Sequence, residues 1–267
     1  SSGLTKTIGH ATEDDMGSDT QMQLIRFVRE DDKDILMANI GAHATFHQSE
    51  TSMSADFPYY FREYVETNNT DLHCAYFIAA AGNQVPTSSL DDETDHTEIS
   101  DYGNTLGQIA LDALGSLTAA EDGNILFSAK TLIAGANLPS ATDLENAEAV
   151  YAQWETLATT NGTTVSEARA TTEGRAAAKN AGFESIYQVS AIIEHSKWNA
   201  ETRHEMVLTT LSIGNMALVF APYEMFCEDG MRIKNGNASN HGITFLATCG
   251  EGDEGYLPTD FGWKINS

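Results

Sequence analysis

The sequence predicts an α/β (α+β) fold in which layered, mixed β-sheets are flanked by helices. Two observations predict this class. Short apolar runs typical of strands alternate along the chain with segments whose apolar residues follow the 3.6-residue helical period. No internal repeat interrupts this alternation, so the elements are expected to pack as layers. The length of 267 residues is ample for a sizeable core.

In the first half of the chain, apolar runs predict strands at Met22–Val28, Asp34–Ile40 and His73–Ala80. The second run is almost entirely apolar and is therefore expected at the centre of a sheet. Asp56 is expected to be the N-cap of a helix with Pro58 in its first turn. The residues expected to face inward are Phe57, Tyr60, Phe61 and Tyr64. A second helix is expected from about Thr97 to Leu117.

In the second half, a strand is expected at Asn124–Ile133, and an Ala-, Glu- and Thr-rich stretch at 143–182 predicts a helical hairpin. We therefore treat 1–267 as a single domain that carries a helical insertion near 143–199. The later elements expected are a hairpin of Glu205–Ile213 and Met216–Ala221 around Gly214-Asn215, a helix beginning near Tyr223, and a strand at Ile243–Thr248.

Charge and cysteine content exclude several classes of partner. Acidic residues number 39 against 14 basic ones, a formal net charge of −25, which disfavours nucleic acid and anionic membrane surfaces. The longest uncharged apolar stretch, around Met216 to Pro222, is too short to cross a bilayer. Cys74, Cys227 and Cys249 form neither a disulfide framework nor a CxxC motif and are expected to be buried free thiols.

Four segments could carry chemistry, because each follows an expected strand, where α/β folds commonly place their sites. His43 follows the central strand and could present an imidazole to a metal. Asn83 lies in a small-residue turn, Glu224 follows a buried strand, and Tyr256 lies in an acidic, glycine-rich loop. For each segment a plain turn, a helix-dipole carboxylate or a flexible surface loop is an equally open interpretation.

The order of these motifs resembles the catalytic N-terminal domain of the neutral/alkaline, non-lysosomal ceramidases, zinc amidases that split the N-acyl bond of ceramide. The chain would be a divergent, bacterial-type relative. The segments that carry the resemblance are His43-Ala44, Ser54-Ala55-Asp56-Phe57-Pro58, Gly82-Asn83-Gln84-Val85-Pro86, Pro222-Tyr223-Glu224 and Gly255-Tyr256-Leu257-Pro258-Thr259.

The resemblance implies a Zn²⁺ site with His43, Glu224 and Tyr256 as ligands. It further implies hydrolysis of an N-acyl amide, in ceramide or another small-molecule or lipid amide, by a metal-activated water. Asp56 and Asn83 are the non-ligating catalytic candidates. We expect Asp56 to brace the His43 loop, Asn83 to point its amide at the cleft, and His47 to lie nearby without ligating.

Three departures from the family pattern keep alternatives open. The Thr-His-Thr-His-Ser-Gly-Pro motif with the family's first zinc histidine is absent, and His10 is a poor substitute. Val85 stands where the family carries Ser, and a second functional tyrosine would fall beyond Ser267. We therefore expect an upstream segment of the same polypeptide to be missing. The alternatives are a non-catalytic ligand-binding relative and a metal-dependent esterase or peptidase.

Overall fold

The computed structural model divides into two compact units, Ser1–Thr131 with Met206–Ser267, and Leu132–Glu205. The residues that it describes are 5–7, 17–47, 53–86, 96–121, 123–135, 138–199, 203–236 and 241–259. Each unit is presented by itself. His10, considered above as a substitute ligand, lies outside the described residues.

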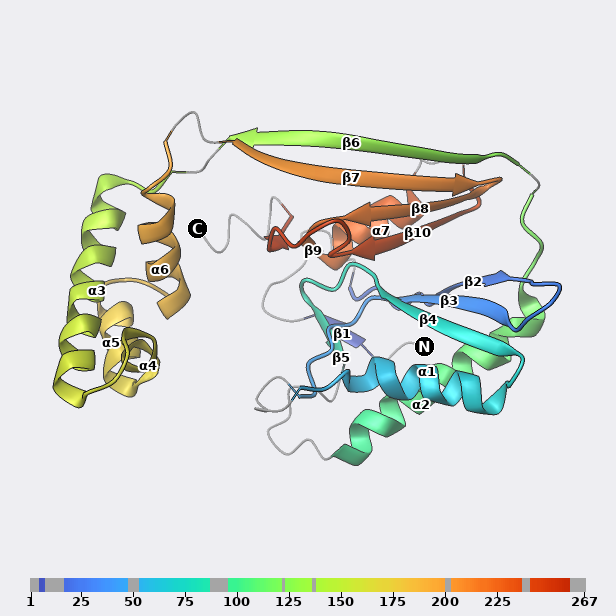
Figure 1. The fold of residues 1–267 in the computed structure, drawn as a ribbon, viewed down its shortest axis with the longest axis horizontal. Helices are drawn as coiled ribbons and strands as arrows, with labels where there is room; N and C mark the ends of the chain where they lie inside the picture. The colour runs from blue at the N-terminus through green and yellow to red at the C-terminus, as the bar shows by residue number, and fades with distance from the viewer. Residues whose placement is uncertain are drawn as a thin grey trace. The chain divides into compact units, whose positions relative to one another are not determined.

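The first sheet of the larger unit contains the three strands expected early in the chain (Figure 1). They are β2 (Gln23–Phe27), β3 (Asp34–Ile40) and β4 (Leu72–Ile78), in the order β2-β3-β4. Strand β3 is central, antiparallel to β2 and parallel to β4. Leu36 and the residues from Ala38 to Ile40 are buried, and the strand lies between two others, which confirms the central position predicted for it.

Two helices cover one face of this sheet, α1 (Asp56–Asn68) and α2 (His96–Ala113), the latter followed by a 3₁₀ turn at Leu114–Ser116. Phe57, Phe61 and Val65 of α1 are fully buried, while Tyr60 is only partly buried. Their 3.6-residue spacing places them on one helix face. The core that they form with the sheet also includes Leu36, Ala38, Leu72, Tyr102 and Leu106.

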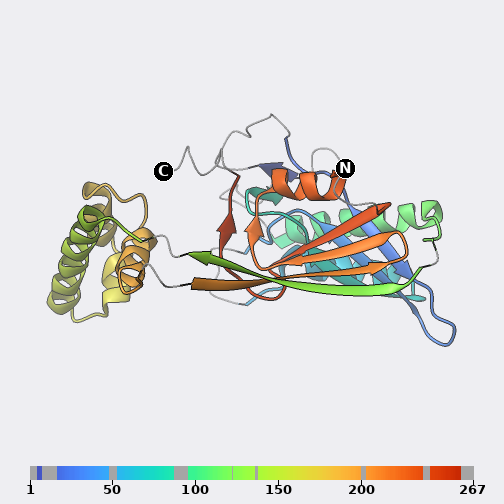
Figure 2. The same ribbon diagram turned by 90° about the horizontal axis from the view of Figure 1, so that it is seen from above.

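The second sheet has the order β10-β8-β7-β6, with β6 as its terminal strand (Figure 2). The strands are β6 (Ile125–Gly135), β7 (Arg203–Ile213), β8 (Met216–Ala221) and β10 (Ile243–Thr248). Strands β7 and β8 form the predicted antiparallel hairpin. Gly214 supplies the positive φ of 55° that its tight turn requires. Strand β10 is parallel to β8.

The two sheets pack face to face, with Ile25, Leu218 and Phe245 in the shared cluster. The Asn39 amide on β3 also donates to the Leu246 carbonyl on β10 at 2.7 Å. Helix α7 (Cys227–Asn235) packs on β10 and, at Gly230, against Ala80. A Cβ at Gly230 would lie 2.3 Å from that of Ala80, so the close approach needs glycine. This packing confirms the predicted layered α+β class.

Two short strand pairs complete the larger unit. Strand β1 (Thr5–Thr7) is antiparallel to β5 (Gln84–Pro86), and β9 (Glu224–Met225) is parallel to β11 (Tyr256–Leu257). The predicted start of the following helix, near Tyr223, is therefore wrong by four residues. Pairing of β9 with β11 keeps Glu224 extended, and α7 begins only at Cys227.

In its described residues, the smaller unit contains four helices with a core of their own, besides the end of β6 and the start of β7. The helices are α3 (Ala141–Asn161), α4 (Val165–Ala170), α5 (Thr172–Asn180) and α6 (Ile186–His195). Trp154 is fully buried at the centre and donates its indole N–H to the Gly174 carbonyl at 2.8 Å. The helical region is as expected, but the stretch 143–182 predicted as a hairpin contains three helices, because Thr164 and Thr171 each cap a new one. Helix α6 follows this stretch and is capped by Ser185. None of the helices described in either unit is long and apolar enough to span a membrane.

Candidate functional site

His43 lies just beyond the end of β3, in an extended segment held by a neighbouring turn. Its main-chain N–H donates to the Gln84 carbonyl at 2.9 Å, and the preceding Ala42 is fully buried. The His43 side chain is itself only 20% exposed. The buried apolar strand β3 therefore places this histidine at the carboxyl edge of the sheet, as the sequence predicted.

Glu224 and Tyr256 are brought together by the parallel pairing of β9 with β11. They are register partners, so their side chains leave the pair on the same face. Main-chain bonds from Glu224 N–H to the Gly255 carbonyl, at 2.9 Å, and from Phe226 N–H to the Leu257 carbonyl, at 3.0 Å, fix the register. Gly255 has a φ of 80°, a conformation that disfavours a side chain at this position.

The three residues predicted as metal ligands converge on one place. His43 Nε2 lies 3.3 Å from Glu224 Oε2, and the His43 and Tyr256 rings are 6.1 Å apart between centroids, inclined at 59°. The Glu224 carboxylate also acts on the Tyr256 hydroxyl, whose pKa it raises. The structure therefore assembles one imidazole, one carboxylate and one phenol from three distant segments of the chain.

The electrostatics of this group centre on Glu224. Partial burial, the Glu224 charge and its hydrogen bond together raise the pKa of Tyr256 to about 12, so the phenol is neutral near neutral pH. His43 Nε2 is buried and forms no hydrogen bond of good geometry with any described residue, although Glu224 is near. A buried nitrogen of this kind usually has a partner.

The unsatisfied His43 nitrogen is the observation that fits a bound metal. Imidazole nitrogen and carboxylate oxygen are donors that suit Zn²⁺, and a cation would favour the ionised phenol of Tyr256. Among the described residues, however, no group of three His, Cys, Asp or Glu side chains is placed to hold a metal. The candidate ligands therefore comprise only two side chains of these types, His43 and Glu224, together with Tyr256.

Asp56 connects the His43 loop to α1. Its carboxylate accepts from the His47 N–H at 2.9 Å and from the Phe57 N–H at 2.7 Å. The side chain is 4% exposed, and its φ of 53° is left-handed, a conformation that Asp tolerates better than most residues. The residue before the helix is Ala55, without a side-chain cap, so Asp56 begins α1 rather than preceding it. These contacts match the bracing arrangement expected of Asp56.

Asn83 differs from expectation, because its amide is bonded to α7. The amide nitrogen donates to both oxygens of buried Glu228, at 3.0 and 3.3 Å, and the amide oxygen accepts from the Cys227 N–H at 2.8 Å. These bonds hold the start of α7, whereas the sequence predicted an amide aimed at a cleft. A Cβ at Gly82 would lie 2.4 Å from the Glu224 carbonyl oxygen, so the turn packs closely against β9 at this glycine.

Other polar residues around the site could not be recognised from the sequence. Gln84 and Glu228 are buried. The sequence does not indicate this, because one polar residue in a turn or in the first turn of a helix is usually exposed.

The three cysteines differ in exposure. Cys249 is exposed, which corrects the expectation of three buried thiols, whereas Cys74 and Cys227 are buried. Its φ of 54° is left-handed, and such strained positions concentrate at functional sites.

Comparison with known proteins defines the class of fold. The chain has a ceramidase-like fold: a ceramidase solved in complex with C2 matches all of this chain with a TM-score of 0.64 at 14% sequence identity. The neutral ceramidase of Pseudomonas aeruginosa matches 99% of the chain with a TM-score of 0.63 at 15% identity. The chain spans about half the length of these structures, 48% and 46% respectively. No protein-family model and no curated protein sequence matches the chain.

Proposed function

We propose that the chain provides part of the active site of a zinc-dependent hydrolase that cleaves N-acyl amide bonds of lipid-like substrates. The observation that supports this proposal most directly is the convergence of His43, Glu224 and Tyr256, with the His43 Nε2 atom lacking a hydrogen bond among the described residues. The likeness of the fold to ceramidases supplies the substrate class.

In this proposal His43, Glu224 and Tyr256 hold the metal. The chemistry that zinc supplies when bound is polarisation of a carbonyl and a lower pKa for a water. Glu224 contributes the negative charge, and its pairing with Tyr256 places the carboxylate and the phenol on the same face. Asp56 holds the loop that carries His43 through the His47 N–H, a supporting role that orients ligands in metal sites.

The test combines zinc content with turnover. Zinc bound per chain is measured in the wild-type full-length polypeptide, in its His43→Ala variant and in its His73→Ala variant, whose histidine is exposed on β4. All three are then assayed on a fluorogenic N-acyl amide with zinc supplied. We expect about one zinc per chain in the wild type and in His73→Ala, and loss of both zinc and turnover in His43→Ala. Sub-stoichiometric zinc that is unchanged by His43→Ala contradicts the proposal.

A second candidate is a ligand-binding relative of the same fold without catalysis. The observation that favours it is the absence, among the described residues, of three His, Cys, Asp or Glu side chains grouped at the site. Val85, where the family carries a serine, is also 1% exposed and presents no polar group. Binding of an N-acyl amide without turnover in the same assay supports this candidate.

A further inference from the structure

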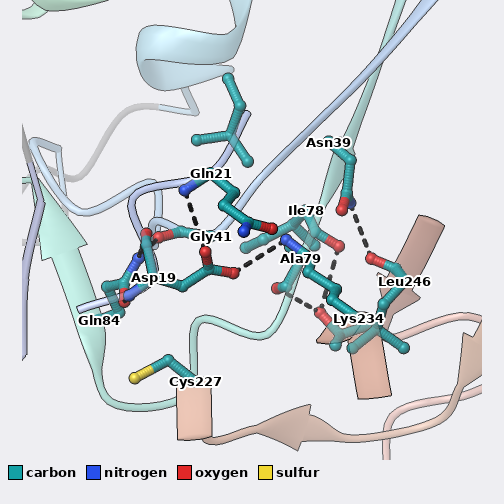
Figure 3. A network of polar contacts seen from close by, with 12 residues as sticks. Asp19, Gln21, Asn39, Gly41, Ile78, Ala79, Gln84, Cys227, Lys234 and Leu246 are labelled. Atoms are coloured by element: carbon teal, nitrogen blue, oxygen red, sulfur yellow. Dashed lines mark hydrogen bonds and ion pairs between the residues drawn. The ribbon is translucent and has the colours of Figure 1, made fainter. Parts of the chain in front are cut away.

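Gln84 is a fully buried amide whose side chain forms three hydrogen bonds. Its Oε1 accepts from the Asp19 N–H at 2.7 Å, and its Nε2 donates to the Asp19 carbonyl at 2.7 Å and to the Gly41 carbonyl (Figure 3). An amide offers two donor hydrogens and one acceptor oxygen. Both donor hydrogens and the oxygen are therefore used to join the segment around Asp19 to the end of β3.

The main chain of Gln84 holds the same segment at a second point. Its carbonyl accepts from the His43 N–H at 2.9 Å, so Gly41 and His43, on either side of Ala42, are both bonded to one residue. The approach at Gly41 is tight: a Cβ there would lie 3.2 Å from Gln84 Nε2 and 3.0 Å from the Ala80 carbonyl oxygen. Gln84 therefore holds the backbone on both sides of Ala42, and we call this set of hydrogen bonds to Gly41 and His43 the Gln84 clamp.

A buried ion pair holds Asp19, the residue to which the Gln84 side chain is bonded. Asp19 Oδ2 lies 2.9 Å from Lys234 Nζ on α7, and the two side chains are 1% and 0% exposed. Asp19 Oδ1 also accepts from the Gln21 N–H at 3.0 Å. A buried charge without its partner is strongly unfavourable, so Asp19 is held at this place and Gln84 with it.

We propose that Gln84, anchored by the Asp19–Lys234 pair, is a positioning residue that fixes His43 for metal binding. This inference rests on the proposed function for its metal. The position of the imidazole, however, is a property of the chain itself. Gln84 touches no reacting group and acts through the Gly41–His43 backbone.

The experiment compares two buried side-chain amides. Gln84→Met keeps the length of the side chain but removes its hydrogen bonds. Asn39→Leu is the matched control, because the Asn39 amide is also 0% exposed and donates to main-chain carbonyls, of Phe77 at 3.2 Å and of Leu246 at 2.7 Å, on β4 and β10. Zinc affinity, the free energy of unfolding in urea and the NMR signals of ¹⁵N-labelled histidines without metal are measured for each.

We expect Gln84→Met to shift the backbone and imidazole signals of His43 and to weaken zinc binding about 10- to 100-fold, as loss of a supporting residue does in metal sites. Asn39→Leu should lower stability and leave zinc affinity within about twofold, since it leaves the clamp intact. Gln84→Asn, which retains the amide on a shorter stem, replaces Gln84→Met if the latter does not fold.

Two outcomes overturn the inference: His43 signals that do not move in the Gln84 variant, or zinc affinity that falls no further than in Asn39→Leu. Failure of the proposed function has a different signature, because the wild type itself then binds no zinc. In that case the His43 signals alone decide whether Gln84 positions the histidine.

Discussion

Glu224 and Tyr256 are register partners in a parallel strand pair of only two residues per strand, and the Glu224 carboxylate raises the pKa of the Tyr256 hydroxyl. This relationship places a negative charge beside a phenol and beside the His43 imidazole, 3.3 Å away. The first three predictions below concern these side chains and Asp56.

Glu224→Gln is expected to reduce zinc affinity by at least about tenfold, because the neutral amide lacks the charge that attracts a cation. Glu254→Gln is the matched control: it removes the same charge from an exposed side chain of the loop before β11. Affinity is measured by competition with a chromophoric chelator. Equal losses in the two variants would show that only overall charge matters.

Ionisation of Tyr256 offers a test that needs no metal. Burial and Glu224 raise its pKa to about 12, so the folded chain holds this proton more tightly than the unfolded chain, whose tyrosines ionise near about 10. Stability from this group is complete below about pH 10 and is lost as the pH rises toward 12. Ultraviolet titration of the wild type minus Tyr256→Phe isolates the group. Glu224→Gln should lower its pKa, and an unchanged curve would contradict the contact.

Asp56→Ala is expected to lower the free energy of unfolding by about 1–3 kcal/mol, because it leaves the N–H groups of His47 and Phe57 without their carboxylate. Asp56→Asn should cost less, since it keeps one acceptor oxygen and tolerates the left-handed φ of 53°. Urea denaturation of both variants measures the difference. The bracing role fails if Asp56→Ala changes neither stability nor zinc affinity.

Alkylation should distinguish the three cysteines. Burial raises the pKa of the Cys74 and Cys227 thiols to about 12, whereas Cys249 is exposed. Iodoacetamide at mildly alkaline pH is therefore expected to modify Cys249 first in the native protein and all three in urea. Peptide mass spectrometry identifies the sites, and prior labelling of Cys74 or Cys227 would contradict their burial.

Removing one charge of the Asp19–Lys234 pair should lower stability more than removing both. Lys234→Met leaves the buried Asp19 carboxylate without its cation and is expected to cost about 3–5 kcal/mol. The double variant with Asp19→Asn should recover part of this loss, because no unpaired charge remains. Denaturant unfolding gives both values. A double variant less stable than Lys234→Met would exclude this explanation.

Much of the fold could be predicted, because its signals are local. The apolar run Asp34–Ile40 is reproduced residue for residue as β3, and the Gly214-Asn215 turn joins the expected hairpin. His43 follows from the same run, since a residue just after a buried parallel strand must lie at the sheet edge.

What could not be predicted depends on contacts between distant segments. Two residues cannot show a strand period, so β9 is recognisable only through its pairing with β11, and a helix was expected there instead. The orientation of Asn83 depends in the same way on Glu228, far along the chain. Local sequence patterns do not identify such distant partners.

The pairing of β9 with β11 also has a consequence for the timing of assembly. His43 comes first in the chain, and Glu224 and Tyr256 follow it only after a long intervening stretch. Closure of such long-range contacts is slow in folding. A nascent or partly folded polypeptide can therefore present the imidazole without the phenol, and a ligand that requires all three side chains recognises only the finished molecule.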